Sequence, residues 1–403
     1  MSLPWTFGVE LEFALAFVYP PSVPLPEPTK TRKLRFKPYR YEIDRFISSY
    51  DLQPIHSANE LADRMKYGSI FTKALVTPAI RRDIALTLHN AGLPVNLMNP
   101  ECEDVLKWKI TIDGTVPYAY TPENLQAVEK GCNIISEKYL IEVNSSTGLH
   151  IHVSAGLKTP FRLETMQNLF AFLYAFEPQL DSLHPEHRQH DNEYCSYSLR
   201  KHSNFIRNWW NEHGQLPTII QGMIELLKKK KTKMELLNAV RWTFNDKAMR
   251  YNVSNLVKYL QDEDEPSNSG IPTIEFRQHE GTLDAQRVVQ WCSTVVGIIN
   301  FVDTADQVYL RNLLLKVDKF GPIPAEGSFT VIDLFRYMHL NEQAKFYSSR
   351  LNPVVGRPPN ARPTVWKWEY EEMYSHGLLT DEEYQRHHEL RLFWEKSLTA
   401  AEA

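Results

Sequence analysis

Three segments of this sequence alternate between apolar and polar residues, and this alternation limits the fold more than any other feature. They are residues 8–13 (GVELEF), 148–154 (GLHIHVS) and 273–279 (TIEFRQH). Because successive side chains of a β-strand point to opposite faces, each segment predicts a strand with one apolar and one polar face. The sequence therefore predicts a β-sheet that buries one face in the core and presents ionisable groups on the other.

The polar faces of these strands carry the first candidate site residues. Those residues are Glu10 and Glu12, His150 and His152, and Glu275, Arg277 and His279. Carboxylates that lie close together repel one another unless a cation lies between them, and carboxylates with imidazoles suit Mg²⁺ or Mn²⁺. An arginine on the same face can bind a phosphate group through two parallel hydrogen bonds. The pattern therefore indicates metal-assisted handling of a nucleoside triphosphate.

Helical periodicity dominates the sequence between these strands. Two strongly apolar segments, residues 163–180 and 284–304, predict helices buried against the sheet. Residues 122–137 predict a further helix, and residues 185–260 predict helices in short pieces. Strands and helices mix without regular alternation, which favours an α+β fold with an antiparallel or mixed sheet and helices on one side.

The character of the sequence changes after about residue 320, where prolines punctuate a helical tail. We therefore expect a catalytic domain over residues 1–319 and a helical C-terminal extension over residues 320–403 that packs on it. With 403 residues, of which 43% are hydrophobic, the chain can form a full core.

Composition narrows the class of protein. The net charge of −4 gives no sign of binding to nucleic acid or to a membrane surface. The four cysteines lack the paired spacing of metal sites. The N-terminus has no signal-peptide pattern, and no segment reaches the roughly 18 apolar residues of a membrane span. We expect a cytoplasmic enzyme that acts on small molecules, and its oligomeric state stays open.

The order of the motifs resembles one protein family. GVELEF, followed far downstream by TGLHIHVS at 147–154 and TIEFRQHEGTLD at 273–284, is similar to the amidoligase family. That family belongs to the glutamine synthetase and glutamate–cysteine ligase superfamily of carboxylate–amine ligases. WKITIDGT at 108–115 and RYNVSNL at 250–256 extend the resemblance, which covers about three-quarters of the chain.

The resemblance implies a fold and a set of site residues. The expected fold is a sheet bent into a funnel, with helices on its outer face, as in the glutamine synthetase catalytic domain. ATP would enter one end of the funnel and an amino-acid-like substrate the other. The residues that resemble the family's metal ligands are Glu10, Glu12, His150 and Glu275. Arg277 resembles the arginine that binds the ATP phosphates, and Asp113 resembles the acidic residue of a D-G-S segment.

Other residues have two interpretations. His152 lies one step along the polar face from His150, where it could contact substrate or phosphate. His279 and Arg250 are candidates for contacting the cofactor, although either could be structural. Arg188 could likewise hold a carboxylate or phosphate or be structural. It lies among the histidines at 184, 187 and 190, whose spacing predicts a solvated segment.

One position departs from the family pattern. Where the family carries a metal-binding glutamate, this chain has Tyr118. A phenol with a pKa near 10 is a poor ligand for Mg²⁺. Either one metal site is weakened, Glu123 or Glu142 takes its place, or the activity has changed.

The function implied by the resemblance is ATP-dependent amide-bond formation. A substrate carboxylate would take the γ-phosphoryl group of ATP to give an acyl phosphate, and an amine would then displace phosphate. Two alternatives remain within the superfamily, which are a phosphotransferase and a non-catalytic binding scaffold. A cupin-like metal oxygenase is disfavoured, because VSAGLK at 153–158 lacks the glutamate expected after its His-x-His pair.

Overall fold

The computed structural model describes residues 5–15, 43–44, 47–48, 77–97, 117–189, 195, 197–228, 232–243, 245–261, 270–316, 329–351 and 385. Asp113 and the rest of the WKITIDGT motif lie outside the described residues.

A five-stranded antiparallel sheet forms the centre of the molecule. In spatial order its strands are β3 (Pro117–Ala119), β1 (Thr6–Leu11), β5 (Gly148–Ser154), β7 (Ile274–Glu280) and β6 (Tyr251–Asn252). A separate two-stranded sheet pairs β2 (Ala14–Leu15) with β4 (Ile141–Glu142). The three strands predicted from alternation are confirmed, and they are neighbours at the centre of the sheet.

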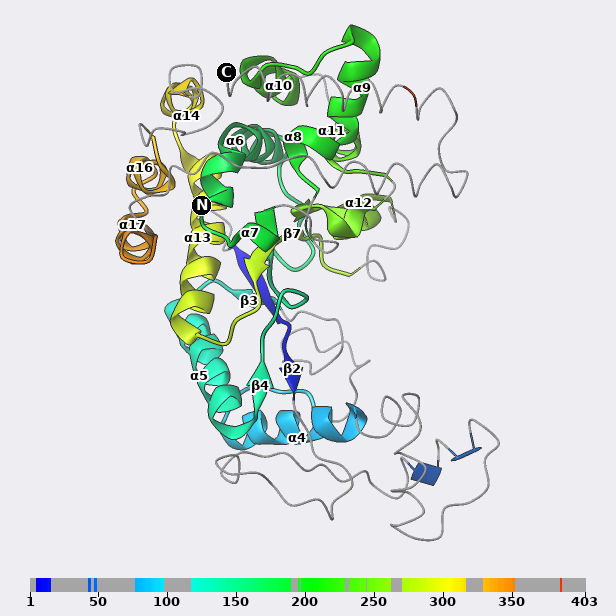
Figure 1. Cartoon of the computed structure of the whole chain (residues 1–403), viewed down its shortest axis with the longest axis vertical. Coiled ribbons are helices and arrows are strands. Elements are labelled where there is room, and N and C mark those ends of the chain that lie inside the picture. The colour runs from blue at the N-terminus through cyan, green and yellow to red at the C-terminus, as the bar shows by residue number, and fades with distance from the viewer. Residues whose placement is uncertain are drawn as a thin grey trace.

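Helices pack against this sheet, so the α+β class is confirmed (Figure 1). Those in the described part of the chain are α4 (Thr77–Asn90), α5 (Pro122–Lys138), α6 (Leu163–Asp181), α7 (Glu186–Gln189), α8 (Leu199–His202), α9 (Asn204–His213), α10 (Ile219–Leu226), α11 (Lys233–Val240), α12 (Ser254–Gln261), α13 (Ala285–Thr304), α14 (Gln307–Leu314), α16 (Val331–Tyr337) and α17 (Asn341–Ser348), together with the 3₁₀ turn η3 (Asp246–Ala248).

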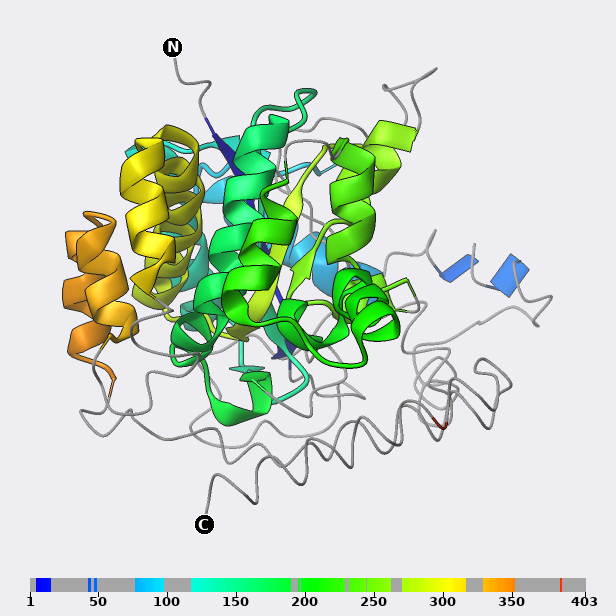
Figure 2. The ribbon, with the colours of Figure 1, turned by 90° about the horizontal axis from the view of Figure 1, so that it is seen from above.

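The core lies between the sheet and the helices α5, α6 and α13. The apolar residues of β5, which are Leu149, Ile151 and Val153, are fully buried there. Figure 2 shows α6 and α13 lying across this face of the sheet, and α13 contacts both β1 and β5. The start of α13 is fixed by Asp284, whose side chain accepts hydrogen bonds from the first turn of the helix.

The register between β5 and β7 contains a bulge. Ile151 pairs with Phe276 but Leu149 pairs with His279, so two residues of β7 lie opposite His150 alone. Because paired residues point to the same face of a sheet, His279 turns toward the core, as Leu149 does. The expectation that His279 shares the polar face is therefore wrong. Its ring centroid lies 5.6 Å from that of Trp291 in α13.

The part of the predicted tail that the structure describes packs on the rest of the molecule. Helices α16 and α17 lie beside α13 in Figure 1, and their residues Phe335 and Tyr347 are buried in the common core. The division into a catalytic domain and an extension stays a prediction. None of the described helices combines the length and apolar character that crossing a bilayer requires.

Candidate active site

The register of the three central strands gathers the predicted ionisable residues. In the pairing of β1 with β5, Glu10 lies opposite His150. In the pairing of β5 with β7, His152 lies opposite Glu275. Since directly opposed side chains on one face lie about 5 Å apart, residues distant in sequence form one cluster here.

The first group of candidate metal ligands is Glu10, Glu12 and His150, each of which offers one ligand atom within 4.8 Å of the others. His150 is 1% exposed, and its Nδ1 lies 3.2 Å from the Oε2 of Glu10. Its Nε2 is buried without a hydrogen-bond partner and lies 3.9 Å from the Oε2 of Glu12. A buried nitrogen without a partner is costly, so this atom is suited to bind a cation.

The second group is Glu10, His152 and Glu275, and it shares Glu10 with the first. The Nε2 of His152 lies 3.5 Å from both the Glu10 Oε2 and the Glu275 Oε1. Sequence reasoning gave His152 a contact with substrate or phosphate, whereas the structure places it beside the same two carboxylates as His150, whose Nδ1 lies 3.2 Å from Glu10 and 3.3 Å from Glu275. The cluster therefore offers two adjacent cation positions joined by one carboxylate.

Residues without a predicted role hold this second group in place. The Oγ1 of Thr273 lies 3.2 Å from the Nδ1 of His152, which leaves Nε2 directed at the carboxylates. Asn252 donates a hydrogen bond of 2.8 Å to the Oε2 of Glu275. Asn252 belongs to the RYNVSNL motif, so the sequence marked this residue. Its partner, Glu275, could be identified only from the pairing of β6 with β7.

The cluster buries negative charge that positive groups offset. Glu10 is 9% exposed and Glu275 is 4% exposed. Arg277 donates a hydrogen bond to Glu275, and its Nη1 lies 3.4 Å from the Nδ1 of His150. Burial raises the pKa of Glu275, but its electrostatic interactions with His152, Arg277 and His150 outweigh burial, so the pKa is lowered overall. Glu275 is therefore held as a carboxylate that can bind a cation.

The structure does not bring every predicted residue to the cluster. Arg250 is 3% exposed, and its Nη1 lies 2.8 Å from Asp181 and 3.6 Å from Glu177, both in α6. The Arg250 guanidinium therefore forms ion pairs with two carboxylates in the core, and the structure does not support the expected contact of Arg250 with a cofactor. His279 lies on the opposite face of the sheet, as its register shows.

The position that departs from the family pattern lies at the edge of the sheet. The backbone of Tyr118 in β3 pairs with that of Phe7. Neither Glu123 nor Glu142 belongs to the ligand groups found among the described residues. The structure therefore gives no support to either glutamate as a replacement ligand.

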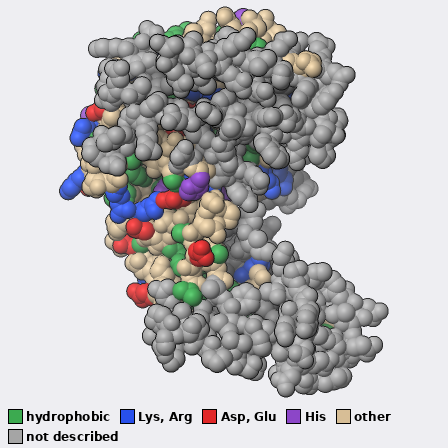
Figure 3. Space-filling view, viewed as in Figure 1, with side chains coloured by type: hydrophobic (Ala, Val, Ile, Leu, Met, Phe, Trp, Pro, Cys, Tyr) green, Lys and Arg blue, Asp and Glu red, His purple; other side chains and the backbone are tan. Residues whose placement is uncertain are grey.

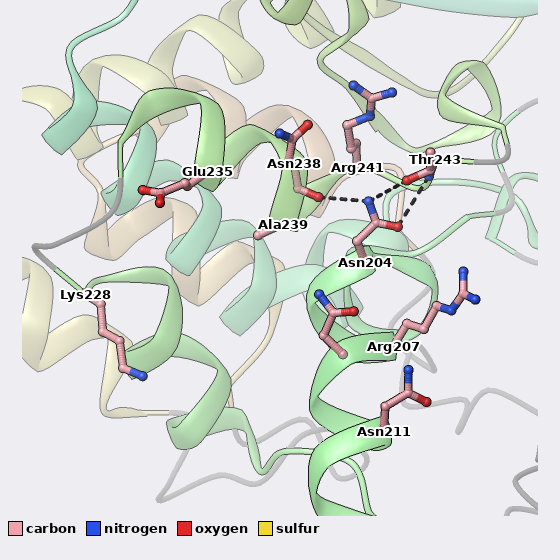
Figure 4. Close-up of a pocket in the computed structure, with 10 residues that line it drawn as sticks. Asn204, Arg207, Asn211, Lys228, Glu235, Asn238, Ala239, Arg241 and Thr243 are labelled. Atoms are coloured by element: carbon pink, nitrogen blue, oxygen red, sulfur yellow. Dashed lines mark hydrogen bonds between the residues drawn. The ribbon is translucent and has the colours of Figure 1, made fainter.

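A cavity of about 830 Å³ lies away from the cluster (Figure 4). Helices α9 and α11 supply most of its lining, which is rich in asparagine side chains such as Asn204 and Asn238. None of the predicted site residues lines it. The face of the molecule drawn in Figure 3 intersperses acidic and basic side chains among its described residues.

Comparison with known proteins gives one family. A family model described as "Putative amidoligase enzyme" matches residues 98–299, which is half of the 403-residue chain. The matched range includes His150, His152, Glu275 and Arg277. Comparisons with curated proteins and with solved structures found no significant match.

Proposed function

Because the chain belongs to the amidoligase family, we propose that it is an ATP-dependent carboxylate–amine ligase that forms an amide bond through an acyl phosphate. The observation that carries this proposal is the pair of adjacent ligand groups sharing Glu10, with Arg277 beside them. We also propose that the sheet is a funnel of the glutamine synthetase type and that the enzyme acts in the cytoplasm on a small carboxylate and a small amine.

The residues of the cluster fit Mg²⁺ or Mn²⁺. Carboxylate oxygens are the ligands that these hard cations prefer, and imidazole is accepted by Mn²⁺. The partnerless Nε2 of His150 supports the fit, since a cation between it and Glu12 would satisfy both. Bound divalent cations supply positive charge that offsets the charge of the nucleotide phosphates.

The residues around the cluster then orient the reacting groups. In the first step, a substrate carboxylate oxygen forms a bond to the γ-phosphorus, and the bond from that phosphorus to the ADP oxygen breaks. In the second, the amine nitrogen bonds to the acyl carbon, phosphate leaves with its electron pair, and the nitrogen loses a proton. Arg277 is 16% exposed at its side chain and lies beside both ligand groups, where it can stabilise charge on the transferred phosphoryl group.

One sequence feature favours an alternative. Tyr118 stands where the family carries a metal-binding glutamate. A weakened metal site would favour a binding scaffold that has lost activity, and a phosphotransferase of the same superfamily remains the other alternative. The products separate these functions, because only the ligase yields an amide together with free phosphate.

The test is a product assay with ATP, Mg²⁺ and mixtures of carboxylates, with hydroxylamine as the amine. Hydroxylamine attacks an acyl phosphate to give a hydroxamate, so the ligase predicts hydroxamate and ADP in equal amounts. Glu275→Gln should abolish both products, and Glu123→Gln, which removes an exposed carboxylate outside the cluster, should not. A phosphorylated substrate without hydroxamate would indicate the phosphotransferase. ADP release that Glu275→Gln leaves unchanged would contradict the assignment of the cluster.

A further inference from the structure

The side-chain amide of Asn252, in β6, has one orientation that fits its neighbours. Asn252 is 8% exposed, and its Oδ1 accepts hydrogen bonds from the backbone nitrogen of Ser254 at 2.9 Å and from the Ser254 Oγ at 2.6 Å. A backbone N–H can only donate, so the oxygen of the amide must face Ser254. The amide nitrogen therefore faces Glu275 and donates to its Oε2 at 2.8 Å.

The two oxygens of Glu275 consequently have different surroundings. Oε2 accepts the hydrogen bond from Asn252, outside the centre of the cluster. Oε1 accepts a hydrogen bond from Arg277 and lies 3.3 Å from the Nδ1 of His150 and 3.5 Å from the Nε2 of His152. Since a carboxylate oxygen has two lone pairs, Oε1 can bind a cation while it accepts the bond from Arg277. Glu275 therefore offers one oxygen to the second ligand group.

The backbone that carries Glu275 is held from several sides. In the sheet, Glu275 lies opposite His152 of β5 and Asn252 of β6. Further along β7, two backbone carbonyls accept hydrogen bonds from Arg188 of α7. Arg188 is 0% exposed, although its segment was expected to be solvated. Because the strand is anchored in this way, turning Oε2 toward a cation requires breaking the hydrogen bond from Asn252.

We infer that Asn252 is a positioning residue that makes Glu275 a ligand through one oxygen, and that it thereby selects Mg²⁺ or Mn²⁺ over Ca²⁺ at the second cation position. Mg²⁺ demands near-octahedral geometry with about six ligands, whereas Ca²⁺ takes about six to eight oxygens and can bind both oxygens of one carboxylate. A carboxylate restricted to one oxygen disfavours the ion that needs more ligands. This inference rests on the cation binding in the proposed function, and it involves neither ATP nor amide formation.

The experiment isolates the second position in Glu12→Gln, which lacks a ligand of the first. Mn²⁺ is added to this protein, to the same protein with Asn252→Ser, and to the same protein with the control Asn208→Ala. Bound Mn²⁺ is measured from the loss of the electron paramagnetic resonance signal of free Mn²⁺, and Ca²⁺ is then added to displace it. Serine can still accept a hydrogen bond from the backbone of residue 254, but it is too short to replace the amide at Glu275. Asn208 is an exposed asparagine that lines the cavity away from the cluster.

Glu12→Gln, with or without Asn208→Ala, should bind Mn²⁺ equally and resist displacement by Ca²⁺. Adding Asn252→Ser should weaken Mn²⁺ binding about tenfold or more, as the loss of a partner of a metal ligand commonly does. The excess of Ca²⁺ that displaces half of the bound Mn²⁺ should also fall about tenfold, because Glu275 can then turn both oxygens to the ion. A general loosening of the fold would weaken both ions and leave this ratio unchanged.

Three results would overturn the inference. The first is an unchanged ratio of Ca²⁺ to Mn²⁺ affinity after Asn252→Ser. The second is equal affinity of Glu12→Gln for the two ions, which needs no substitution at Asn252 and so holds even if that variant does not fold. The third is the absence of Mn²⁺ binding by Glu12→Gln.

The hydroxamate assay decides the proposed function separately. If the wild type forms neither hydroxamate nor ADP but the Mn²⁺ results are as expected, the ligase proposal fails and the role of Asn252 stands. If hydroxamate forms and Asn252→Ser leaves the ratio of the two ions unchanged, only the inference about Asn252 fails.

Discussion

At the scale of single residues, Glu10 has a position that none of the other candidate ligands shares. It belongs to both ligand groups found among the described residues, whereas Glu12 and His150 belong only to the first and His152 and Glu275 only to the second. A carboxylate can bridge two cations because its two oxygens each offer lone pairs. Substitution of Glu10 and substitution of Glu12 are therefore expected to affect cation binding differently.

Substitution of these glutamates should change the number of bound cations in a residue-specific way. Glu10→Gln should weaken both cation positions by more than about tenfold, because it removes the shared ligand. Glu12→Gln should remove only the first position. The number of cations bound per protein is measured by adding Mn²⁺ and recording how much of the electron paramagnetic resonance signal of free Mn²⁺ is lost. Glu142→Gln serves as the control, since Glu142 lies outside both groups. Equal effects of Glu10→Gln and Glu12→Gln would contradict the shared ligand.

The burial of His279 makes folding sensitive to acid. Burial lowers the pKa of His279 to about 4, against about 6.5 in an unfolded chain, although its hydrogen bond to the carbonyl of Glu280 opposes the shift. In the unfolded state the His279 imidazole therefore binds a proton below about pH 6.5, whereas in the folded state it binds one only below about pH 4. The free energy of unfolding should fall over this interval by up to about 1.4 kcal/mol per pH unit.

Urea unfolding at pH 7 and pH 5 measures this effect. The wild type should lose about 2 kcal/mol more than His279→Gln between the two pH values, because glutamine does not titrate. His184 contacts the same ring and also has a lowered pKa through burial, so His279→Gln should retain part of the acid sensitivity. The same loss in both proteins would mean that His279 does not contribute.

At the scale of elements, close packing of α10 on α6 depends on a glycine. A Cβ at Gly222 would lie 2.3 Å from the ring of Tyr174, which is 2% exposed. Gly222→Ala should therefore destabilise the fold by about 1–3 kcal/mol, although alanine favours the helix by about 1 kcal/mol. Thermal unfolding measures the change. Ile224→Ala is the matched control, since Ile224 is 58% exposed on the same helix and should change stability little.

The elements show how far the sequence determines the site. The alternation of residues 148–154 gave the bounds of β5, and apolar periodicity gave α6 and α13 to within one residue. Alternation also placed Glu10, His150, His152 and Glu275 on polar faces, because each lies in a regular stretch of strand. It failed at His279, since a bulge depends on how two strands pair and neither strand shows it alone.

The same reasoning explains why the sequence left two roles open for Arg188 and predicted none for Asn252. Both act through partners that are distant in sequence. Arg188 binds backbone carbonyls of β7, and Asn252 binds the carboxylate of Glu275. Every residue has a backbone carbonyl, so the sequence does not reveal which arginine binds one. A buried arginine of this kind therefore cannot be distinguished, from the sequence, from a surface arginine in a polar segment.

At the scale of the whole molecule, the cluster exists only when the sheet is assembled. Its ligands come from β1 and the residue Glu12 just after it, from β5 and from β7, and more than a hundred residues of chain separate each of these strands from the next. The central claim is that this assembled cluster binds a metal–nucleotide complex. Cation binding should therefore be linked to folding, as it is wherever a site is absent from the unfolded chain.

The most direct test is calorimetric titration of Mg²⁺ with a non-hydrolysable ATP analogue into the wild type, Glu275→Ala, Arg277→Ala and the control Glu123→Ala. We predict metal-dependent, micromolar binding to the wild type and to Glu123→Ala, and its loss in Glu275→Ala and Arg277→Ala. Absence of nucleotide binding with any divalent cation, or equal binding by all four proteins, would contradict the assignment of this cluster as the nucleotide site.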